Sequence, residues 1–422
     1  MRGLILDPRP YNLSPARFCP GRDGNDNRIC VECSVYITTE EELISLCKRL
    51  KECQMLAVDT EFVREKTYFH QLGLIQIAGD GVCAIVDPIS IKNLNPLLAL
   101  IKNPQMLKVF HAGRQDLEIL YRLCGEAIRP VFDTQIAATM VGWGAQISFA
   151  KIVQKVTGKR IHKTETYTDW CRRPLSKNQI DYALDDVRYL VPVYEKLVKS
   201  LKKMNRLEWL DEEWRELENI EKYCLPNPRT QFTKIKNIRS LNPRNLAVLR
   251  ELALWREEEA MRRDCLPKAI IRDEPLLEIA RHLPQDLKNL TAFRGLNPKE
   301  ASQSAEQIFK VIKIGLAVPE EQFPVLQESQ GYATSAGVES LLAAYVQIRS
   351  EELQIEPNML ADRKLIHEFV KYYELKKELG ELPLFQGWRK ELIGKTLYSI
   401  LDGQVGLVID KGGKVSLIAV NQ

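Results

Sequence analysis

The sequence has no long hydrophobic run. None of its segments approaches the roughly 18 to 20 consecutive apolar residues that a membrane-spanning helix needs. The first thirty residues also lack the apolar segment and the small-residue cleavage site of a secretory signal. With 45% hydrophobic and 27% charged residues, the composition is that of a globular protein in water. We therefore expect a cytoplasmic protein that makes no use of a membrane.

Cysteine and histidine are few and irregularly spaced, with ten cysteines and five histidines among 422 residues. A chain of this length can fold without disulfide bonds, so reduced thiols are expected. Cys30 and Cys33 form a CxxC pair with Cys19 upstream. A structural zinc site needs a fourth ligand, and no matching cysteine or histidine pair follows. The sequence therefore does not favour a zinc protein.

The chain is too long for one ordinary core, and its composition changes along its length. Residues 1–34 carry Pro, Gly, Asn and Asp without apolar periodicity, which predicts a mobile extension. Residues 35–209 alternate strand-like and helix-like segments, which predicts an α/β domain with a mixed sheet. A linker over 210–232 precedes two all-α helical bundles, predicted at 233–316 and 317–422. The last of these ends in a hairpin that turns at Gly412–Gly413.

Local signals fix several elements within this plan. Thr39 and Glu42 form a capping box at the start of a helix that is predicted to run through Leu50. The segments MLAVDTEF, LGLIQIA and VCAIVDP are strand-like, and Gly79-Asp80-Gly81 between the last two predicts a tight hairpin. A weak repeat relates LAVLRELALWREEEAMRRDCLPKAIIRDEPLLEIA to LLAAYVQIRSEELQIEPNMLADRKLIHEFV. This repeat indicates two successive small helical bundles better than one large bundle.

Two acids lie at the end of an apolar, strand-like run. Asp59 and Glu61 are two residues apart, so their side chains project from the same face of a strand, while those of Val58 and Thr60 project from the other. Burying both carboxylates without compensation would cost several kcal/mol, so a shared proton or a divalent cation is the expected remedy. Oxygen ligands without nearby histidine or cysteine favour Mg²⁺ or Mn²⁺ over zinc. A solvent-exposed strand end is the alternative.

Further candidate residues follow in two later segments. Asp116 lies in the first turn of a helix that begins just beyond a strand, where open α/β sheets form their functional crevice. Tyr182 and Asp186 are four residues apart on one side of a helix whose other side is apolar. Taken singly, Asp116 could simply complement the helix dipole, and the Tyr-Asp pair could be an ordinary surface pair.

Positive charge is concentrated between Glu221 and Glu251, a span without acidic residues. Lys234, Lys236 and Arg239 are the candidates there for contact with a nucleic-acid backbone. The solvated face of a basic helix is the alternative interpretation.

The ordered motifs VDTEF, HAGRQDL and YALDD resemble those of the ribonuclease D branch of the DEDD-type 3′→5′ exonucleases, in the tyrosine subtype. One departure is His70, where the family pattern has proline. The resemblance covers residues 35 to about 205 and implies a ribonuclease H-like exonuclease domain. Residues 233–316 and 335–405 resemble two copies of the HRDC domain, the second more divergent. No counterpart is apparent for the first 34 residues.

The resemblance also implies a chemistry for these residues. Asp59, Glu61, Asp116 and Asp186 would hold two divalent metal ions, Mg²⁺ or Mn²⁺, and Tyr182 would orient the attacking water. The product would be a nucleoside 5′-monophosphate released from an RNA 3′ end, and precursor tRNAs are the substrates that the family suggests. A monomer is expected. A DNA 3′→5′ exonuclease and a non-catalytic nucleic-acid-binding scaffold remain the alternatives.

Overall fold

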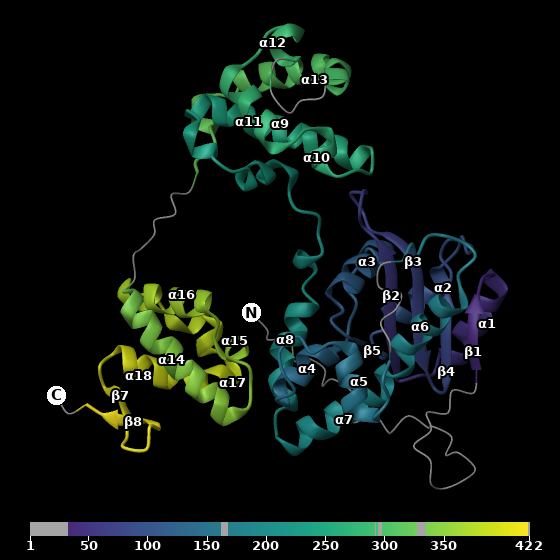
Figure 1. Ribbon diagram of the computed structural model, residues 1–422, viewed down its shortest axis with the longest axis vertical. Coiled ribbons are helices and arrows are strands. Elements are labelled where there is room, and N and C mark those ends of the chain that lie inside the picture. The colour runs from purple at the N-terminus through teal and green to yellow at the C-terminus, as the bar shows by residue number, and fades with distance from the viewer. Residues whose placement is uncertain (1–32, 162–167, 292, 294–297, 327–334, 421–422) are drawn as a thin grey trace, which may run out of the picture. The chain divides into compact units, whose positions relative to one another are not determined.

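The computed structural model describes residues 33–161, 168–291, 293, 298–326 and 335–420 (Figure 1). Residues 1–32 of the predicted N-terminal extension, with Cys19 and Cys30, lie outside these residues, whereas Cys33 and Ser34 belong to the first strand of the sheet. The chain divides into two compact units. Among the described residues, the first unit contains 33–61, 72–223 and 335–420, and the second contains 62–71 and 224–326. Within the described part of the chain, no helix combines the length and apolar character needed to cross a bilayer.

A six-stranded mixed sheet forms the framework of the first unit, in the order β1-β4-β3-β2-β5-β6. β3 and β4 pair antiparallel, whereas β1 with β4, β2 with β5, and β5 with β6 pair parallel. The nine-residue strands β2 and β3 lie in the middle of the sheet. The strands are β1 (Cys33–Ile37), β2 (Met55–Val63), β3 (Gln71–Gly79), β4 (Val82–Val86), β5 (Leu107–Phe110) and β6 (Val131–Asp133).

Helices connect these strands and cover the sheet (Figure 1). A core cluster joins the sheet to α1, α2 and α3 and includes the fully buried Leu56 and Val58 of β2. Because side chains alternate along a strand, Asp59 and Glu61 project from the face opposite to Leu56 and Val58. The helices are α1 (Glu40–Leu50), α2 (Asn95–Lys102), α3 (Arg114–Cys124), α4 (Thr134–Met140), α5 (Phe149–Thr157), α6 (Lys177–Arg188), α7 (Leu190–Lys203), η1 (Leu207–Trp209), α8 (Leu210–Leu217) and η2 (Ile220–Lys222).

The locally encoded elements are confirmed. Helix α1 begins after Thr39 with the predicted capping box to Glu42 and ends at Leu50. The hairpin between β3 and β4 turns at Asp80 and Gly81, which both have positive φ as a tight two-residue turn requires. Among the residues whose side chains are described, seven cysteines are free thiols, as expected for a chain of this size.

The second unit contains a helical domain, which we call the first helical domain (224–326), together with residues 62–71. Its helices pack around a core that includes the fully buried Val248, Leu276 and Ile308. The hydroxyl of Tyr68 donates to Glu257 in this unit, at 3.2 Å. The elements are η3 (Pro228–Lys234), η4 (Ile238–Ser240), α9 (Pro243–Arg262), α10 (Pro267–Ile270), α11 (Asp273–His282), α12 (Leu287–Thr291), α13 (Pro298–Leu316) and η5 (Glu320–Gln322).

A second helical domain (335–420) completes the first unit. Its first three helices repeat the long-short-medium order of α9, α10 and α11, so the weak repeat in the sequence corresponds to two similar bundles. The predicted C-terminal hairpin is present. The elements are α14 (Ala336–Leu353), α15 (Pro357–Leu360), α16 (Arg363–Glu374), η6 (Leu379–Glu381), η7 (Pro383–Phe385), α17 (Gly387–Arg389), the π-helix η8 (Lys390–Gly394), α18 (Lys395–Leu401), β7 (Val405–Ile409) and β8 (Val415–Ala419).

Within the first unit, the end of α14 packs against the loop that follows α4. Arg206 donates to the carbonyl of Met140 at 2.9 Å and to that of Leu353 at 2.7 Å. The backbone N–H of Ala145 donates to Glu356 at 3.0 Å. Gly142 has φ of +76°, and a Cβ there would lie 2.6 Å from the carbonyl oxygen of Gln354. Only glycine therefore fits this contact without a shift.

Candidate active site

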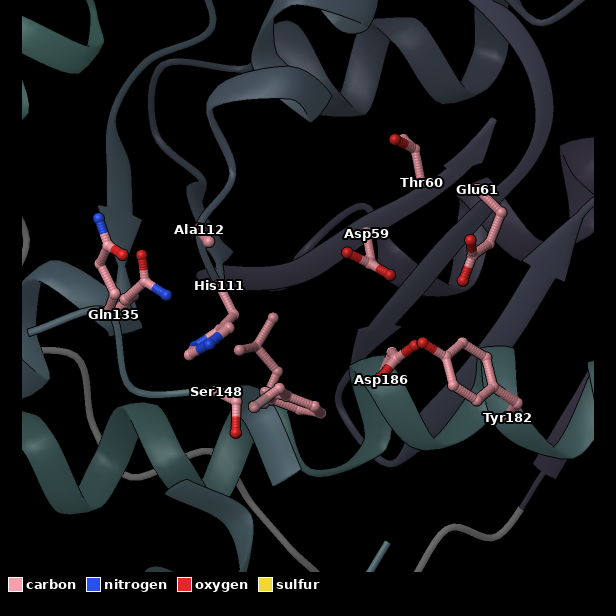
Figure 2. Close-up of a pocket in the computed structure, with 12 residues that line it drawn as sticks. Asp59, Thr60, Glu61, His111, Ala112, Gln135, Ser148, Tyr182 and Asp186 are labelled. Carbon is pink, nitrogen blue, oxygen red and sulfur yellow. The ribbon is translucent and has the colours of Figure 1, made fainter. Parts of the chain in front are cut away.

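Three carboxylates from two elements converge on the face of β2 opposite to Leu56 and Val58. Asp59 and Glu61 extend from β2, and Asp186 extends from α6 (Figure 2). One carboxylate oxygen from each residue lies within 4.8 Å of the others. All three side chains are half-buried. The predicted grouping of these three residues is thus present, although the sequence separates Asp59 from Asp186 by more than a hundred residues.

Helix α6 presents Tyr182 and Asp186 on its sheet-facing side near these acids (Figure 2). The helix begins with the predicted capping box, in which the Ser176 side chain accepts from the backbone N–H of Gln179 and the Gln179 side chain accepts in return. Ala183 and Val187 are fully buried, which sets the rotation of the helix. One turn separates Tyr182 from Asp186, so both reach the same pocket.

Asp116 is buried beside the three-carboxylate cluster and is not part of it. It lies in the first turn of α3, and the Thr60 hydroxyl donates to it at 2.5 Å. The turn before α3 is fixed by Asp133 at the end of β6, because the backbone N–H groups of Ala112 and Gly113 donate to its carboxylate at 3.1 and 2.8 Å. The expectation that Thr60 projects away from Asp59 and Glu61 agrees with this bond to α3.

The pKa values of the acids reflect their crowding. Burial raises the pKa of Asp59 well above its usual range, and the charges of Asp116, Asp186 and Glu61 raise it further. Burial also raises the pKa of Asp116 to about 6, despite the hydrogen bond from Thr60. Carboxylates that are costly to ionise side by side are those that a divalent cation would stabilise. The donor set, oxygen atoms alone, fits Mg²⁺ or Mn²⁺.

A pocket of about 490 Å³ opens over the cluster. Besides the acids and Tyr182, residues from the β5–α3 turn, α4 and the loop before α5 form its wall (Figure 2). His111 is anchored there by contacts with the Thr134 hydroxyl at 2.9 Å and the Ile147 carbonyl at 3.1 Å. These wall residues were not predicted from the sequence, because nothing local distinguishes them from ordinary loop residues. Together with Thr60 of β2, Phe149 of α5 and Leu190 of α7, they are His111, Ala112, Gln135, Gln146 and Ser148.

The basic segment is more neutralised than its sequence indicates. One acid from elsewhere in the second unit approaches it, since Arg244 pairs with Glu320 at 3.4 Å, and Glu251 at the end of the span pairs with Arg250 at 2.9 Å. The three predicted contact residues are all exposed at or near η3 and η4. These three residues are Lys234, Lys236 and Arg239.

Comparison with known proteins assigns the family. A family described as 3′-5′ exonuclease matches residues 34–202. Ribonuclease D of Nitrobacter hamburgensis is 35% identical over 89% of this chain and 97% of its own length. The chain belongs to the ribonuclease D family. Ribonuclease D of Acidiphilium cryptum is similarly related, with 36% identity over 91% of this chain and 97% of its own.

The rest of the ribonuclease D architecture matches as well. An HRDC domain matches residues 245–312, and the C-terminal HRDC domain of ribonuclease D matches residues 340–397. The crystal structure of Escherichia coli RNase D superposes with a TM-score of 0.76 at 32% identity, over 88% of this chain and 99% of that one. The predicted fold class, an exonuclease domain with a mixed sheet followed by HRDC domains, is confirmed. The protein is a hydrolytic exoribonuclease of this family.

Proposed function

We propose that the protein removes nucleotides from RNA 3′ ends by two-metal-ion hydrolysis and releases nucleoside 5′-monophosphates. The observation that carries the proposal is the gathering of Asp59, Glu61 and Asp186 within 4.8 Å, beside the buried Asp116. Four acids at one place would repel each other at neutral pH, so they fit a role as ligands of divalent cations.

Each carboxylate has a separate part in the proposal. Asp59, Glu61 and Asp186 would hold one divalent cation, and Asp116 together with Asp59 would hold the second. When bound, the two ions neutralise charge on the phosphate and lower the pKa of the attacking water. The raised pKa of Asp59 supports this assignment, because a cation between the acids would favour the ionised carboxylate.

Tyr182 orients the attacking water by hydrogen bonding. A tyrosine hydroxyl is a poor general base, so orienting the water by a hydrogen bond is the role that its chemistry allows. Its place on the pocket wall, one helical turn from Asp186, supports this role. No covalent intermediate is required, since water is the nucleophile.

The substrates we propose are precursor tRNAs with 3′ extensions, acted on in the cytoplasm by a monomer. The related E. coli enzyme is an exoribonuclease involved in structured RNA processing. The pocket above the acids has a volume of about 490 Å³, which is in the range that accommodates a small ligand such as a terminal nucleotide. The exposed Lys234, Lys236 and Arg239 are the proposed contacts for the RNA backbone.

The proposal is tested by digesting a 3′-extended tRNA transcript with Mg²⁺, with Mn²⁺ and with EDTA. Stepwise shortening from the 3′ end, release of 5′-monophosphates and complete loss of both in EDTA are expected. Digestion of a single-stranded DNA oligomer of matched sequence distinguishes an exoribonuclease from the alternative, a DNA 3′→5′ exonuclease. Equal digestion of RNA and DNA would contradict a preference for RNA, digestion of DNA alone would contradict an RNA substrate, and full activity in EDTA would contradict the metal mechanism.

A further inference from the structure

A buried ion pair ties the segment before α6 to the sheet. Arg173 donates to both carboxylate oxygens of Asp87, from Nε at 2.6 Å and from Nη2 at 2.7 Å. Asp87 directly follows β4 and its side chain is 1% exposed. The same guanidinium donates to the Gly73 carbonyl of β3 at 2.8 Å. Arg173 therefore joins two neighbouring strands through one planar group.

The remaining donors of Arg173 hold the segment's own backbone. Nη1 donates to the carbonyls of Trp170 and Arg172, at 2.8 and 2.9 Å. The Trp170 side chain is only 2% exposed. A Cβ at Gly73 would lie 2.7 Å from the Trp170 carbonyl oxygen and 2.8 Å from its Cβ, so the segment lies directly on the sheet.

Trp170 in turn contacts the tyrosine of the candidate active site. The Trp170 and Tyr182 rings have centroids 5.9 Å apart and planes inclined by 38°. The Trp170 ring packs against the Tyr182 ring itself, so it limits the positions that the Tyr182 side chain can take, whereas the helix is held by its own buried residues Ala183 and Val187. The chain of contacts thus runs from Asp87 through Arg173 and Trp170 to Tyr182.

We infer that Arg173 is a positioning residue for the reaction: by fixing Trp170 against the sheet, it holds Tyr182 at the place where it orients water. This inference rests on the proposed role of Tyr182. It adds a residue that lies outside the pocket wall and outside the set of acids. Lysine cannot replace it, because a single ammonium group cannot bind Asp87 with two parallel N–H groups and the carbonyls at the same time.

The test measures kcat, KM and Mn²⁺ affinity on an RNA oligomer for Arg173→Lys, in the wild-type and in the Tyr182→Phe background. In the wild-type background kcat should fall about tenfold, because a displacement of Tyr182 by less than about 1 Å should cost less than the roughly hundredfold that a misplacement of a catalytic group by about 1 Å can cost. KM and Mn²⁺ affinity should change less than about twofold, because the acids keep their own supports. In the Tyr182→Phe background the same substitution should lower kcat less than about twofold, because the group it positions has lost its hydroxyl.

Two variants complete the design. Trp170→Phe reduces the contact with Tyr182 without touching the ion pair, and it should reproduce the kcat loss if Arg173→Lys fails to fold. Arg172→Lys, at the exposed neighbouring position, is the matched control and should behave as wild type. Thermal unfolding followed by circular dichroism checks that each variant is folded.

Equal kcat losses in the two backgrounds would overturn the inference, as would wild-type kcat in folded Arg173→Lys. Wild-type kcat in Tyr182→Phe would instead refute the proposed role of the tyrosine, and the inference with it. The metal mechanism is tested separately, because its tests are the Asp186→Ala variant and digestion in EDTA, neither of which involves Tyr182.

Discussion

The Asp87 carboxylate offers a direct test of the energetics of the sheet. Besides Arg173, it accepts from the Tyr36 hydroxyl at 2.5 Å and from the backbone N–H of Ile89 at 2.9 Å. Asp87→Asn keeps the shape and removes the charge. Breaking a buried ion pair on one side costs roughly 3 to 5 kcal/mol. Since the Arg173 side chain is 21% exposed, we expect the low end, about 3 kcal/mol at pH 7.

The dependence on pH follows from the pKa of Asp87. Burial alone would raise this pKa, but the hydrogen bonds from Arg173, Tyr36 and Ile89 lower it from 3.8 to about 2. The unfolded chain therefore binds more protons than the native one between these values, and stability falls as pH falls. The difference amounts to about 2 kcal/mol, fully present above about pH 5 and roughly half lost at pH 3.

Native-state hydrogen exchange of the β4 amides is the suitable assay, because it reports opening of this sheet even when the domains unfold separately. The free energy of opening should differ between wild type and Asp87→Asn by about 3 kcal/mol at pH 7 and about 2 kcal/mol at pH 3. Asp169→Asn, an exposed acid in the segment held by Arg173, is the control and should change little. A difference below about 1 kcal/mol at pH 7, or one that stays constant between pH 5 and 3, would refute the reasoning.

Three further predictions concern the metal site, the RNA contact and the sheet. Asp186→Ala should weaken Mn²⁺ binding in calorimetry and lower kcat about a hundredfold or more; wild-type turnover at saturating Mn²⁺ would contradict the ligand assignment. Replacing Lys234, Lys236 and Arg239 together by glutamine should reduce the magnitude of the slope of log RNA affinity against log salt concentration by about 2, measured by filter binding. An unchanged slope would mean that these charges face only water. Lys108→Met should destabilise the sheet by about 3 kcal/mol in the same hydrogen-exchange assay, because the buried ammonium donates to three backbone carbonyls. A loss below about 1 kcal/mol would show that those carbonyls find other donors.

The parts of the fold that could be predicted are those that depend on residues close together in the sequence. The capping boxes at Thr39 and Ser176 and the turn at Gly81 each depend on residues within one turn of each other. The common face of Asp59 and Glu61 follows from the alternation of a strand alone. Their meeting with Asp186 came from the family resemblance, since no local rule joins segments so far apart.

The remainder depends on partners distant in sequence. The bond between Arg173 and Asp87 joins residues 86 positions apart, and neither residue carries a local signal. Likewise, Glu320 approaches Arg244 across 76 positions, so a stretch that is purely basic in sequence is partly neutralised in the fold. The separation of Asp116 from the three-carboxylate cluster is also a tertiary property, set by the turn that Asp133 holds.

The contact between α14 and the loop after α4 changes how shortened forms of the chain should be interpreted. The loop that donates to Glu356 through Ala145 also supplies Gln146 and Ser148 to the pocket. A chain ending before residue 335 would lose this acceptor along with any RNA-binding surface of the second helical domain. Slower digestion by such a fragment could therefore come from a displaced pocket wall or from weaker RNA binding. A dinucleotide substrate, which is too short to extend beyond the pocket, would distinguish the two, because only the displaced wall would slow its digestion.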